Sequence, residues 1–305
     1  MKKETFLRGV IPPMVTLFKD DYSVDWEANS LLVNYLIKKG VHGILILGSL
    51  GEFVHLSIEE RKKFAEFIVR EVNGRVPVLV GVGHTSTDIV IDLGRHAENI
   101  GANYLLIVTP YYLDLNDEAI LKHYSRIADS VNLPILLYNF PRLTGINISI
   151  DLVDIIVSKN ENIIGIKDTT SDYSHTQNLV RKIKNKKRNF SVFTGNDNYL
   201  LANLIDGGDG VIDGTVNFIP ELSIKIFELF EKKDFFNAIL LQRKLNNYSE
   251  LYKLLKPSIS VIKEAIKIKT LLNISNIVRE PGIQINSTIR KKIKNILQEF
   301  DFKLN

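Results

Sequence analysis

Short apolar segments alternate with longer segments in which apolar residues recur every three or four positions, from the N-terminal end to about residue 230. Short apolar runs bounded by turn residues are typical of buried strands, and the wider spacing is typical of amphipathic helices. Their alternation predicts parallel strands joined by helical crossovers. The expected strands cover residues 9–17, 43–47, 76–80, 104–108, 135–138, 163–166, 190–194 and 210–212, and the expected helices cover residues 26–39, 58–72, 88–100, 118–130, 149–158, 175–186, 199–205 and 220–231.

Eight strands and eight helices are the numbers of a (β/α)8 barrel. An open, doubly wound sheet also alternates strands with helices, but its usual strand number is about six. The predicted fold class is therefore α/β, a (β/α)8 TIM barrel with a C-terminal helical region.

The last part of the chain has helical periodicity only, over residues 234–255, 258–272 and 286–300, with breaks at Pro257 and at Pro281-Gly282. No Gly/Ser-rich linker precedes it, so we expect it to pack against the barrel rather than to move freely. The predicted division is a catalytic barrel over residues 1–232 and a helical region over residues 233–305.

The composition is that of a globular protein. The 305 residues are 45% hydrophobic and 24% charged, which excludes a disordered chain or a coiled coil. There is no cysteine. Disulfides, thiolate metal sites, iron–sulfur clusters and a cysteine nucleophile are therefore excluded.

The charge balance gives no sign of a nucleic-acid or membrane partner. Thirty-nine basic and 35 acidic residues leave a net charge of +4, and the one dense basic run, residues 182–188, lacks interleaved aromatic residues. We interpret it as a solvated helix end. No segment reaches the roughly 20 apolar residues of a membrane span, and the first residues do not resemble a signal peptide. We expect a cytoplasmic protein.

The reacting groups of such a barrel come from the carboxyl ends of its strands. The strand over residues 163–166 runs into Lys167, and an amine held in a barrel mouth is desolvated, which favours the neutral, nucleophilic form. The alternative is a lysine whose stem is buried while its charge reaches water. Tyr138 ends the preceding strand at the matching height and can act as an acid or base beside Lys167. Its alternative is a core aromatic residue.

Three glycine-containing segments are weaker indications of a binding site. Residues 48–52, Gly-Ser-Leu-Gly-Glu, form a turn whose backbone N–H groups could converge on a carboxylate, or a plain strand-to-helix turn. Residues 81–86 lack the third glycine of a dinucleotide loop, and residues 207–210 precede the last strand, on the stability face. The six histidines show no zinc-ligand spacing and no dinucleotide loop is present, so we expect neither a metal nor an organic cofactor.

Taken together, several motifs resemble the dihydrodipicolinate synthase / N-acetylneuraminate lyase superfamily of class I, pyruvate-handling enzymes. The resemblance extends from residue 8 to about residue 280 and implies a (β/α)8 barrel that forms a covalent lysine imine with pyruvate. The motifs are Pro-Pro-Met-Val-Thr at 12–16, Gly-Ser-Leu-Gly-Glu at 48–52, Thr-Pro-Tyr-Tyr at 109–112, Tyr-Asn-Phe-Pro at 138–141 with Thr-Gly at 144–145, and Gly-Ile-Lys-Asp-Thr at 165–169.

The resemblance also implies catalytic roles. Lys167 matches the imine-forming lysine and Tyr138 the acid/base tyrosine. Ser49 matches the hydroxyl of a proton relay, which Tyr112 of a neighbouring subunit completes. A relay shared between subunits implies a homo-oligomer, by family analogy a homotetramer.

The pyruvate site follows from the same resemblance. The carboxylate would lie on the hydroxyl and N–H of Ser49 and the N–H of Leu50, with Gly195 and Ile212 lining the pocket. Many members carry a hydroxyl residue where this chain has Leu50, so binding here would depend more on backbone donors.

One position bears on the choice of substrate. Synthases of the lysine pathway carry an arginine where this chain has Leu143, and Arg142 lies one residue earlier. We expect Arg142 to point away; the alternative is that its side chain swings into the site. The loops resemble more closely the branch that cleaves 2-keto-3-deoxy sugar acids. The hydroxyl groups of such a substrate need short polar partners, and the matching positions offer Thr169, Asn196, Asp197, Asn198 and Thr215.

The expected function is therefore that of a class I aldolase of Entner–Doudoroff-type carbohydrate metabolism. It would cleave 2-keto-3-deoxy-D-gluconate reversibly to pyruvate and D-glyceraldehyde. The non-phosphorylated form is preferred because residues 195–198 and 213–215 contain no cation for a phosphate. The alternatives are 4-hydroxy-tetrahydrodipicolinate synthase, N-acetylneuraminate lyase, and a non-catalytic barrel that binds a keto acid or sugar acid.

Overall fold

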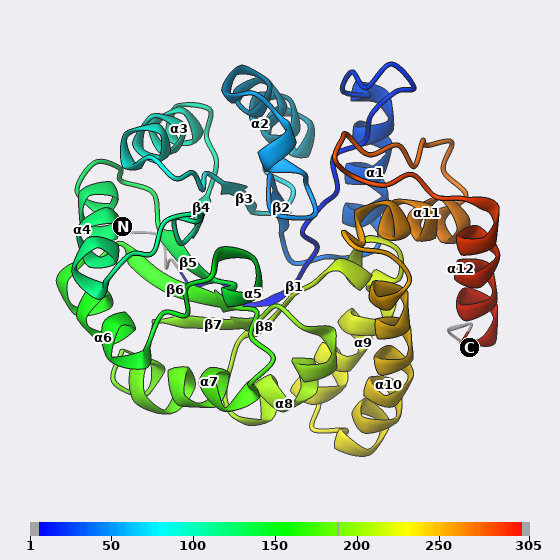
Figure 1. Ribbon diagram of the computed structural model, residues 1–305. Helices are drawn as coiled ribbons and strands as arrows, with labels where there is room; N and C mark the ends of the chain where they lie inside the picture. The colour runs from blue at the N-terminus through cyan, green and yellow to red at the C-terminus, as the bar shows by residue number, and fades with distance from the viewer. Residues whose placement is uncertain (1–5, 188, 301–305) are drawn as a thin grey trace.

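A computed structural model describes residues 6–187 and 189–300 of the chain. Its centre is an eight-stranded parallel sheet in the order β1-β8-β7-β6-β5-β4-β3-β2, curled into a barrel (Figure 1). The strands are β1 (Gly9–Ile11), β2 (Ile44–Ile46), β3 (Val78–Gly81), β4 (Tyr104–Val108), β5 (Ile135–Asn139), β6 (Ile163–Asp168), β7 (Ser191–Thr194) and β8 (Gly210–Ile212).

The barrel closes between β1 and β2 just beyond the regular part of β1. Pro13 forms a parallel bridge with Leu45, and the N–H of Met14 donates to the carbonyl of Leu45 at 2.7 Å. The predicted strand over residues 9–17 is thus too long, because Pro12 and Pro13 have no N–H with which to continue a ladder. The closed arrangement confirms the predicted (β/α)8 barrel.

Helices surround the barrel, and polar residues begin several of them (Figure 1). Ser57 and Glu60 form a reciprocal capping box at α2, and Asn116 caps α4. The surrounding helices are α1 (Trp26–Lys38), α2 (Ile58–Val72), α3 (Thr87–Asn99), α4 (Asp117–Ala128), α6 (Ile150–Lys159), α7 (Tyr173–Asn178), α8 (Leu200–Ile205) and α9 (Pro220–Glu231).

The helix predicted over residues 175–186 has two parts. After α7 the chain continues as a π-helical turn, Leu179–Lys184, which contains the first basic residues of the run at 182–188. Residue 188 of that run lies outside the described residues.

The C-terminal region consists of α10 (Phe235–Asn247), a 3-10 segment (Tyr248–Lys253), α11 (Ile259–Thr270) and α12 (Ser287–Glu299), beside α9 and α1 (Figure 1). The predicted helix over 234–255 is too long, since regular α-helix ends at Asn247. The tighter segment brings the Tyr252 hydroxyl to within 2.8 Å of the Asp213 carboxylate at the end of β8. Helical periodicity alone could not show this tertiary contact.

All residues of the eight strands are buried, which explains their continuous apolar runs. One face of each strand fills the barrel and the other is covered by helices. None of the described helices is both long enough and apolar enough to cross a membrane.

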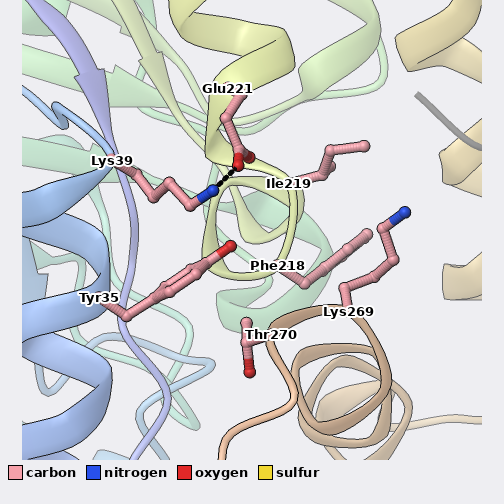
Figure 2. A pocket seen from close by; sticks show the side chains of 7 residues that line it. All are labelled: Tyr35, Lys39, Phe218, Ile219, Glu221, Lys269 and Thr270. Atoms are coloured by element: carbon pink, nitrogen blue, oxygen red, sulfur yellow. Dashed lines mark hydrogen bonds and ion pairs between the residues drawn. The ribbon is translucent and has the colours of Figure 1, made fainter. Parts of the chain in front are cut away.

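A small cavity of about 400 Å³ lies where α1, α9 and the end of α11 meet (Figure 2). The ammonium of Lys39 forms an ion pair with Glu221 across it, which joins α1 to α9. Burial and the charge of Glu221 raise the pKa of Tyr35, whose hydroxyl points into the same space. The ion pair thus holds two barrel helices together, and the C-terminal region adds Lys269 and Thr270 to the same cavity wall.

Candidate active site

A cavity of about 710 Å³ opens at the carboxyl ends of the strands. It lies where (β/α)8 barrels place their reacting groups. All the residues singled out from the sequence except Tyr112 and Thr215 line it, namely Ser49, Leu50, Tyr138, Leu143, Lys167, Thr169, Gly195, Asn196, Asp197, Asn198 and Ile212.

Lys167 and Tyr138 are direct neighbours in this cavity. They are register partners on the parallel strands β6 and β5, so their side chains emerge at the same height. The Lys167 ammonium nitrogen lies 4.3 Å from the centroid of the Tyr138 ring. Both side chains are almost fully buried, with exposures of 5% and 4%. An amine and a phenol are thus held together away from bulk water.

Gly195 leaves the room that Lys167 needs. A Cβ atom at this position would lie 1.8 Å from Thr169 Oγ1 and 3.1 Å from Lys167 Cε, so any side chain here would displace one of them. The glycine follows β7 because a strand neighbouring β6 must pass close to the lysine stem.

The loop that carries Ser49 is held in a bent conformation from both ends. Leu47 and Glu52 have positive φ angles of 56° and 54°, in the left-handed region that is costly for such residues. The hydroxyl of Thr16 donates to the carbonyl of Gly51 at 2.7 Å inside the fold. These constraints place Ser49 and Leu50 on the cavity wall.

Glu52 fixes this loop to the C-terminal region. Its fully buried carboxylate accepts hydrogen bonds from Lys263 Nζ at 2.5 Å and from the N–H of Arg279 at 3.0 Å, and contacts His55 Nδ1 at 3.0 Å. Burial lowers the pKa of Lys263 to about 8 despite the charge of Glu52. The pair is separated by 211 positions along the chain, so no local pattern predicts it.

Asp168, the residue after the candidate lysine, is fully buried, and both of its carboxylate oxygens have hydrogen-bond partners. Its carboxylate accepts from Asn139 Nδ2 at 2.8 Å and Thr176 Oγ1 at 2.7 Å, and contacts His175 Nδ1 at 3.0 Å. The other ring nitrogen of His175 lies 2.9 Å from the carbonyl of Ile148. Burial opposes a charged imidazole, but the hydrogen bond and charge of Asp168 outweigh it and raise the pKa of His175. This network fixes the carboxyl end of β6, directly after Lys167.

Two carboxyl groups and a phenol line the cavity just after the ends of β7 and β8. Asp197 and Asp213 are 4% and 6% exposed, and Tyr252 reaches Asp213 from the C-terminal region. Burial, and then the charge of Asp213, raise the pKa of Asp197 well above its usual range. Burial and the charges of Asp213 and Asp197 likewise raise the pKa of Tyr252. The sequence indicated Asp197 as a site residue and placed residues 213–215 at the pocket, but it did not indicate Tyr252.

Cationic side chains also line the cavity, and sequence reasoning missed two of them, Lys253 and Lys256. Lys253 and Lys256 come from the C-terminal region, where no strand-end rule points to them. Arg142 lies on the cavity wall, 5.3 Å over the ring of Phe140, instead of pointing away as expected. The short helix α5 (Pro141–Thr144), which we did not predict, carries Arg142 and Leu143 together to the opening.

Tyr112 does not line the cavity of its own chain. Its side chain is 93% exposed and its φ angle is 83°, a strained value for a tyrosine. Thr215, also named from the sequence, is fully buried behind the wall and does not line the cavity. Among residues 6–187 and 189–300, no group of three or more histidine and acidic side chains is arranged to hold a metal ion.

A model of the dihydrodipicolinate synthetase family matches residues 6–300. YagE of Escherichia coli K12, provisionally named a 2-dehydro-3-deoxy-D-gluconate aldolase, is 36% identical over 299 residues, 98% of this chain and 99% of YagE. The crystal structure of YagE in complex with pyruvate superposes with a TM-score of 0.94, covering 96% of this chain and 98% of that one.

Two further proteins show the range of the similarity. YjhH of Escherichia coli K12, provisionally named a 2-dehydro-3-deoxy-D-pentonate aldolase, is 39% identical over 259 residues, 85% of this chain and 86% of YjhH. The crystal structure of dihydrodipicolinate synthase from Thermotoga maritima has a TM-score of 0.91 at 30% identity, covering 97% of this chain and 99% of that one. The chain described here therefore belongs to the dihydrodipicolinate synthetase family, and the relatives named above carry aldolase and synthase names.

Proposed function

We propose that the protein is a class I aldolase that cleaves 2-keto-3-deoxy-D-gluconate reversibly to pyruvate and D-glyceraldehyde through an imine on Lys167. The observation that carries the proposal is the contact of the buried Lys167 amine with the buried Tyr138 ring at the floor of the cavity. Class I aldolase chemistry needs such a pair, one group to bond to the ketone and one to move protons.

The proposed reaction proceeds in balanced steps. The neutral amine of Lys167 attacks the C2 ketone. The hydroxyl of the resulting carbinolamine leaves as water with the proton of the Tyr138 hydroxyl, which gives an iminium ion and the Tyr138 phenolate. Tyr138, as the phenolate, removes the proton of the C4 hydroxyl; the C3–C4 bond breaks, and its electron pair passes to C3 and the iminium to give an enamine and glyceraldehyde. Protonation at C3 and hydrolysis release pyruvate and the free amine.

The imine itself accepts the electron pair, so the proposed reaction uses no added metal or organic cofactor. Extensive dialysis against a chelator is expected to leave kcat within about twofold, since no step needs a Lewis acid. A loss of activity that Mg²⁺, Zn²⁺ or another divalent ion restores would contradict this part of the proposal.

Ser49 and Leu50 are proposed to hold the pyruvate carboxylate, and Ser49 to pass protons between Tyr138 and Tyr112 of a neighbouring subunit. The full exposure of Tyr112 on the single chain supports its use by a second copy. We propose a homotetramer on the family analogy. Light scattering gives the mass in solution, and Tyr112→Phe is expected to lower kcat without changing the extent of imine formation at saturating pyruvate.

The aldehyde half of the substrate would lie beside Thr169, Asn196, Asp197 and Asn198 on the cavity wall. Neutral side chains that donate and accept hydrogen bonds suit a row of hydroxyl groups. The provisional names of YagE and YjhH, both aldolases of 2-keto-3-deoxy sugar acids, support this substrate class. Lys253 and Lys256 also line the cavity and could bind a phosphate group, so the phosphorylated sugar acid is the first alternative substrate to test.

A second candidate is 4-hydroxy-tetrahydrodipicolinate synthase, because Arg142 lines the cavity and could bind the carboxylate of an amino-acid aldehyde. N-acetylneuraminate lyase is disfavoured at Gly214. A Cβ atom there would lie 2.6 Å from Tyr252 Oη and 2.8 Å from Leu50 Cδ1, so the serine common in those lyases would require both side chains to shift.

Borohydride reduction in the presence of pyruvate, followed by peptide mapping, tests the imine. The label is expected on Lys167 and is expected to be lost in Lys167→Arg, whose guanidinium is not a nucleophile at neutral pH. Label on another lysine would refute the mechanism. A panel of 2-keto-3-deoxygluconate, its phosphate, 2-keto-3-deoxygalactonate and N-acetylneuraminate, with aspartate semialdehyde plus pyruvate as the counter-candidate, separates the substrates.

A further inference from the structure

The residues that directly follow the two candidate catalytic residues are joined by a closed cycle of hydrogen bonds. Asn139 Nδ2 donates to Asp168 Oδ1 at 2.8 Å, and the N–H of Ile148 donates to Asn139 Oδ1 at 3.0 Å. His175 closes the cycle, with Nε2 2.9 Å from the carbonyl oxygen of Ile148 and Nδ1 3.0 Å from Asp168 Oδ2. This strand-end cycle links the ends of β5 and β6 to α7 and to the segment before α6.

The strand-end cycle lies behind the wall of the barrel. Tyr138 and Lys167 line the cavity. Successive side chains of a strand point to opposite faces, so Asn139 and Asp168 point away from the cavity, toward the surrounding helices. Both have no exposed surface, and the side chain of His175 is 10% exposed. No member of the cycle lines the cavity, so the cycle can influence a reaction only through the strand ends that it holds.

The hydrogen-bond partners of His175 define its protonation. Both of its ring nitrogens face acceptors, the carbonyl oxygen of Ile148 and the carboxylate of Asp168. A neutral imidazole has one N–H, so one nitrogen would then present a lone pair to an acceptor, whereas an imidazolium donates to both. Thr176 Oγ1 also donates to Asp168 Oδ2, at 2.7 Å, which stabilises the carboxylate form of Asp168. The closed cycle therefore requires a doubly protonated His175.

The charges around His175 favour this form. Asp168 faces it from β6, and Asp172, at the N-cap of α7, adds a second negative charge. To the cycle, β5 contributes the uncharged amide of Asn139, and the segment before α6 contributes backbone groups of Ile148. Burial favours a neutral imidazole, but the hydrogen bond and charge of Asp168 and the charge of Asp172 raise the pKa of His175. The imidazolium form is thus favoured at neutral pH and is lost as the pH rises through this raised pKa.

We propose that His175 is a positioning residue of the aldolase reaction, because its imidazolium closes the cycle that holds Lys167 and Tyr138 at a fixed separation. The inference rests on the proposed function and adds a residue that acts through others. When His175 loses a proton, two acceptors face each other and the cycle opens, so the end of β6 can shift relative to β5. Displacing reacting groups by about 1 Å can lower a rate by about 100-fold.

The test compares His175→Gln with His96→Gln, a matched control that removes a histidine between α2 and α3, where it contacts Glu66. The quantity measured is kcat per site that borohydride traps with pyruvate, so that unfolded copies do not count. His175→Gln is expected to lower this kcat by about 10- to 100-fold, with KM for 2-keto-3-deoxygluconate changed by less than about threefold. His96→Gln is expected to stay within about twofold for both constants. An unaltered kcat in His175→Gln, or a loss confined to KM, would overturn the proposal.

The pH dependence separates a charged positioning residue from one that merely fills space. The ratio of kcat of the unmodified protein to that of His175→Gln is expected to be largest near about pH 6.5 and to narrow toward about pH 9.5. Only the unmodified protein has a proton to lose from this imidazole, and the ionisations of Lys167 and Tyr138 are common to both proteins and cancel in the ratio. A ratio that is constant with pH would overturn the proposal.

Asp168→Asn is the second variant, because it restores the cycle without charge. Its amide can donate to Nδ1 of a neutral His175, while Nε2–H still donates to the carbonyl of Ile148. This variant is expected to keep kcat per trapped site well above that of His175→Gln, in a ratio that does not change with pH. A kcat as low as that of His175→Gln would show that closure of the cycle does not position the pair.

Borohydride trapping keeps the two proposals separate. Absence of the label from Lys167 of the unmodified protein would refute the aldolase function itself. Labelled Lys167 combined with an unaltered kcat in His175→Gln would refute only the role of His175.

Discussion

Replacing Glu52 by glutamine tests how the C-terminal region holds the candidate active site. The substitution keeps the size of the side chain and removes its charge. The carboxylate receives a charged donor, Lys263 Nζ, and the N–H of Arg279, and it contacts His55 Nδ1. An amide has only one acceptor oxygen, so at least one of these groups then faces an NH2 group.

The expected loss in the free energy of unfolding follows from the burial of the pair. Glu52 and Lys263 have no exposed side-chain surface, and removing one partner of a buried pair costs about 3–5 kcal/mol. Lys263 would give up its proton more easily than in the unmodified protein, in which burial already lowers its pKa to about 8. That release limits the loss, so we expect the free energy of unfolding to fall by about 3 kcal/mol, which for a chain of 305 residues corresponds to a fall in Tm of about 5 °C.

The assay is thermal and urea unfolding, monitored through the fluorescence of Trp26, the single tryptophan. Its ring centroid lies 5.0 Å from that of Phe67. The matched variants are Lys263→Met and the double variant Glu52→Gln/Lys263→Met. The double variant is expected to lose less than the sum of the two single losses, because it leaves no charge unpaired. A loss below about 1 kcal/mol for Glu52→Gln, or strictly additive losses, would refute the reasoning.

Two other predictions concern Gly195 in the cavity and the ion pair between Arg279 and Glu60. Gly195→Ala places a Cβ atom 1.8 Å from Thr169 Oγ1 and 3.1 Å from Lys167 Cε. The side chains must move apart, so kcat is expected to fall about 100-fold through displacement of Lys167. A kcat within about twofold of that of the unmodified protein would contradict this prediction. The hydrogen bond and charge of Arg279 lower the pKa of Glu60 from 4.5 to about 2. The stability that this pair contributes is present above pH 4.5 and is lost as the pH falls toward 2, so the Tm difference between the unmodified protein and Arg279→Gln is expected to narrow over that range. A constant Tm difference would show that Glu60 is not the group involved.

The local pattern predicted the barrel because strand burial and helical amphipathicity are encoded within short windows. The eight apolar runs are buried on both faces, which makes them continuous rather than alternating. Lys167 and Tyr138 could be paired in advance, since both end neighbouring parallel strands and such strands keep their side chains at one height. The length of β1 was mispredicted, because Pro12 and Pro13 keep the apolar pattern while they remove the N–H groups of a ladder.

The sequence by itself therefore determined the architecture, the floor of the cavity and the family. Only the tertiary structure decided what surrounds that floor, because the groups concerned lie far apart along the chain. Tyr252 reaches Asp213 across 39 positions, and Lys263 reaches Glu52 across 211. Neither contact leaves a periodic signal, since each depends on how the C-terminal helices pack on the barrel and on the protonation that burial imposes on the groups brought together.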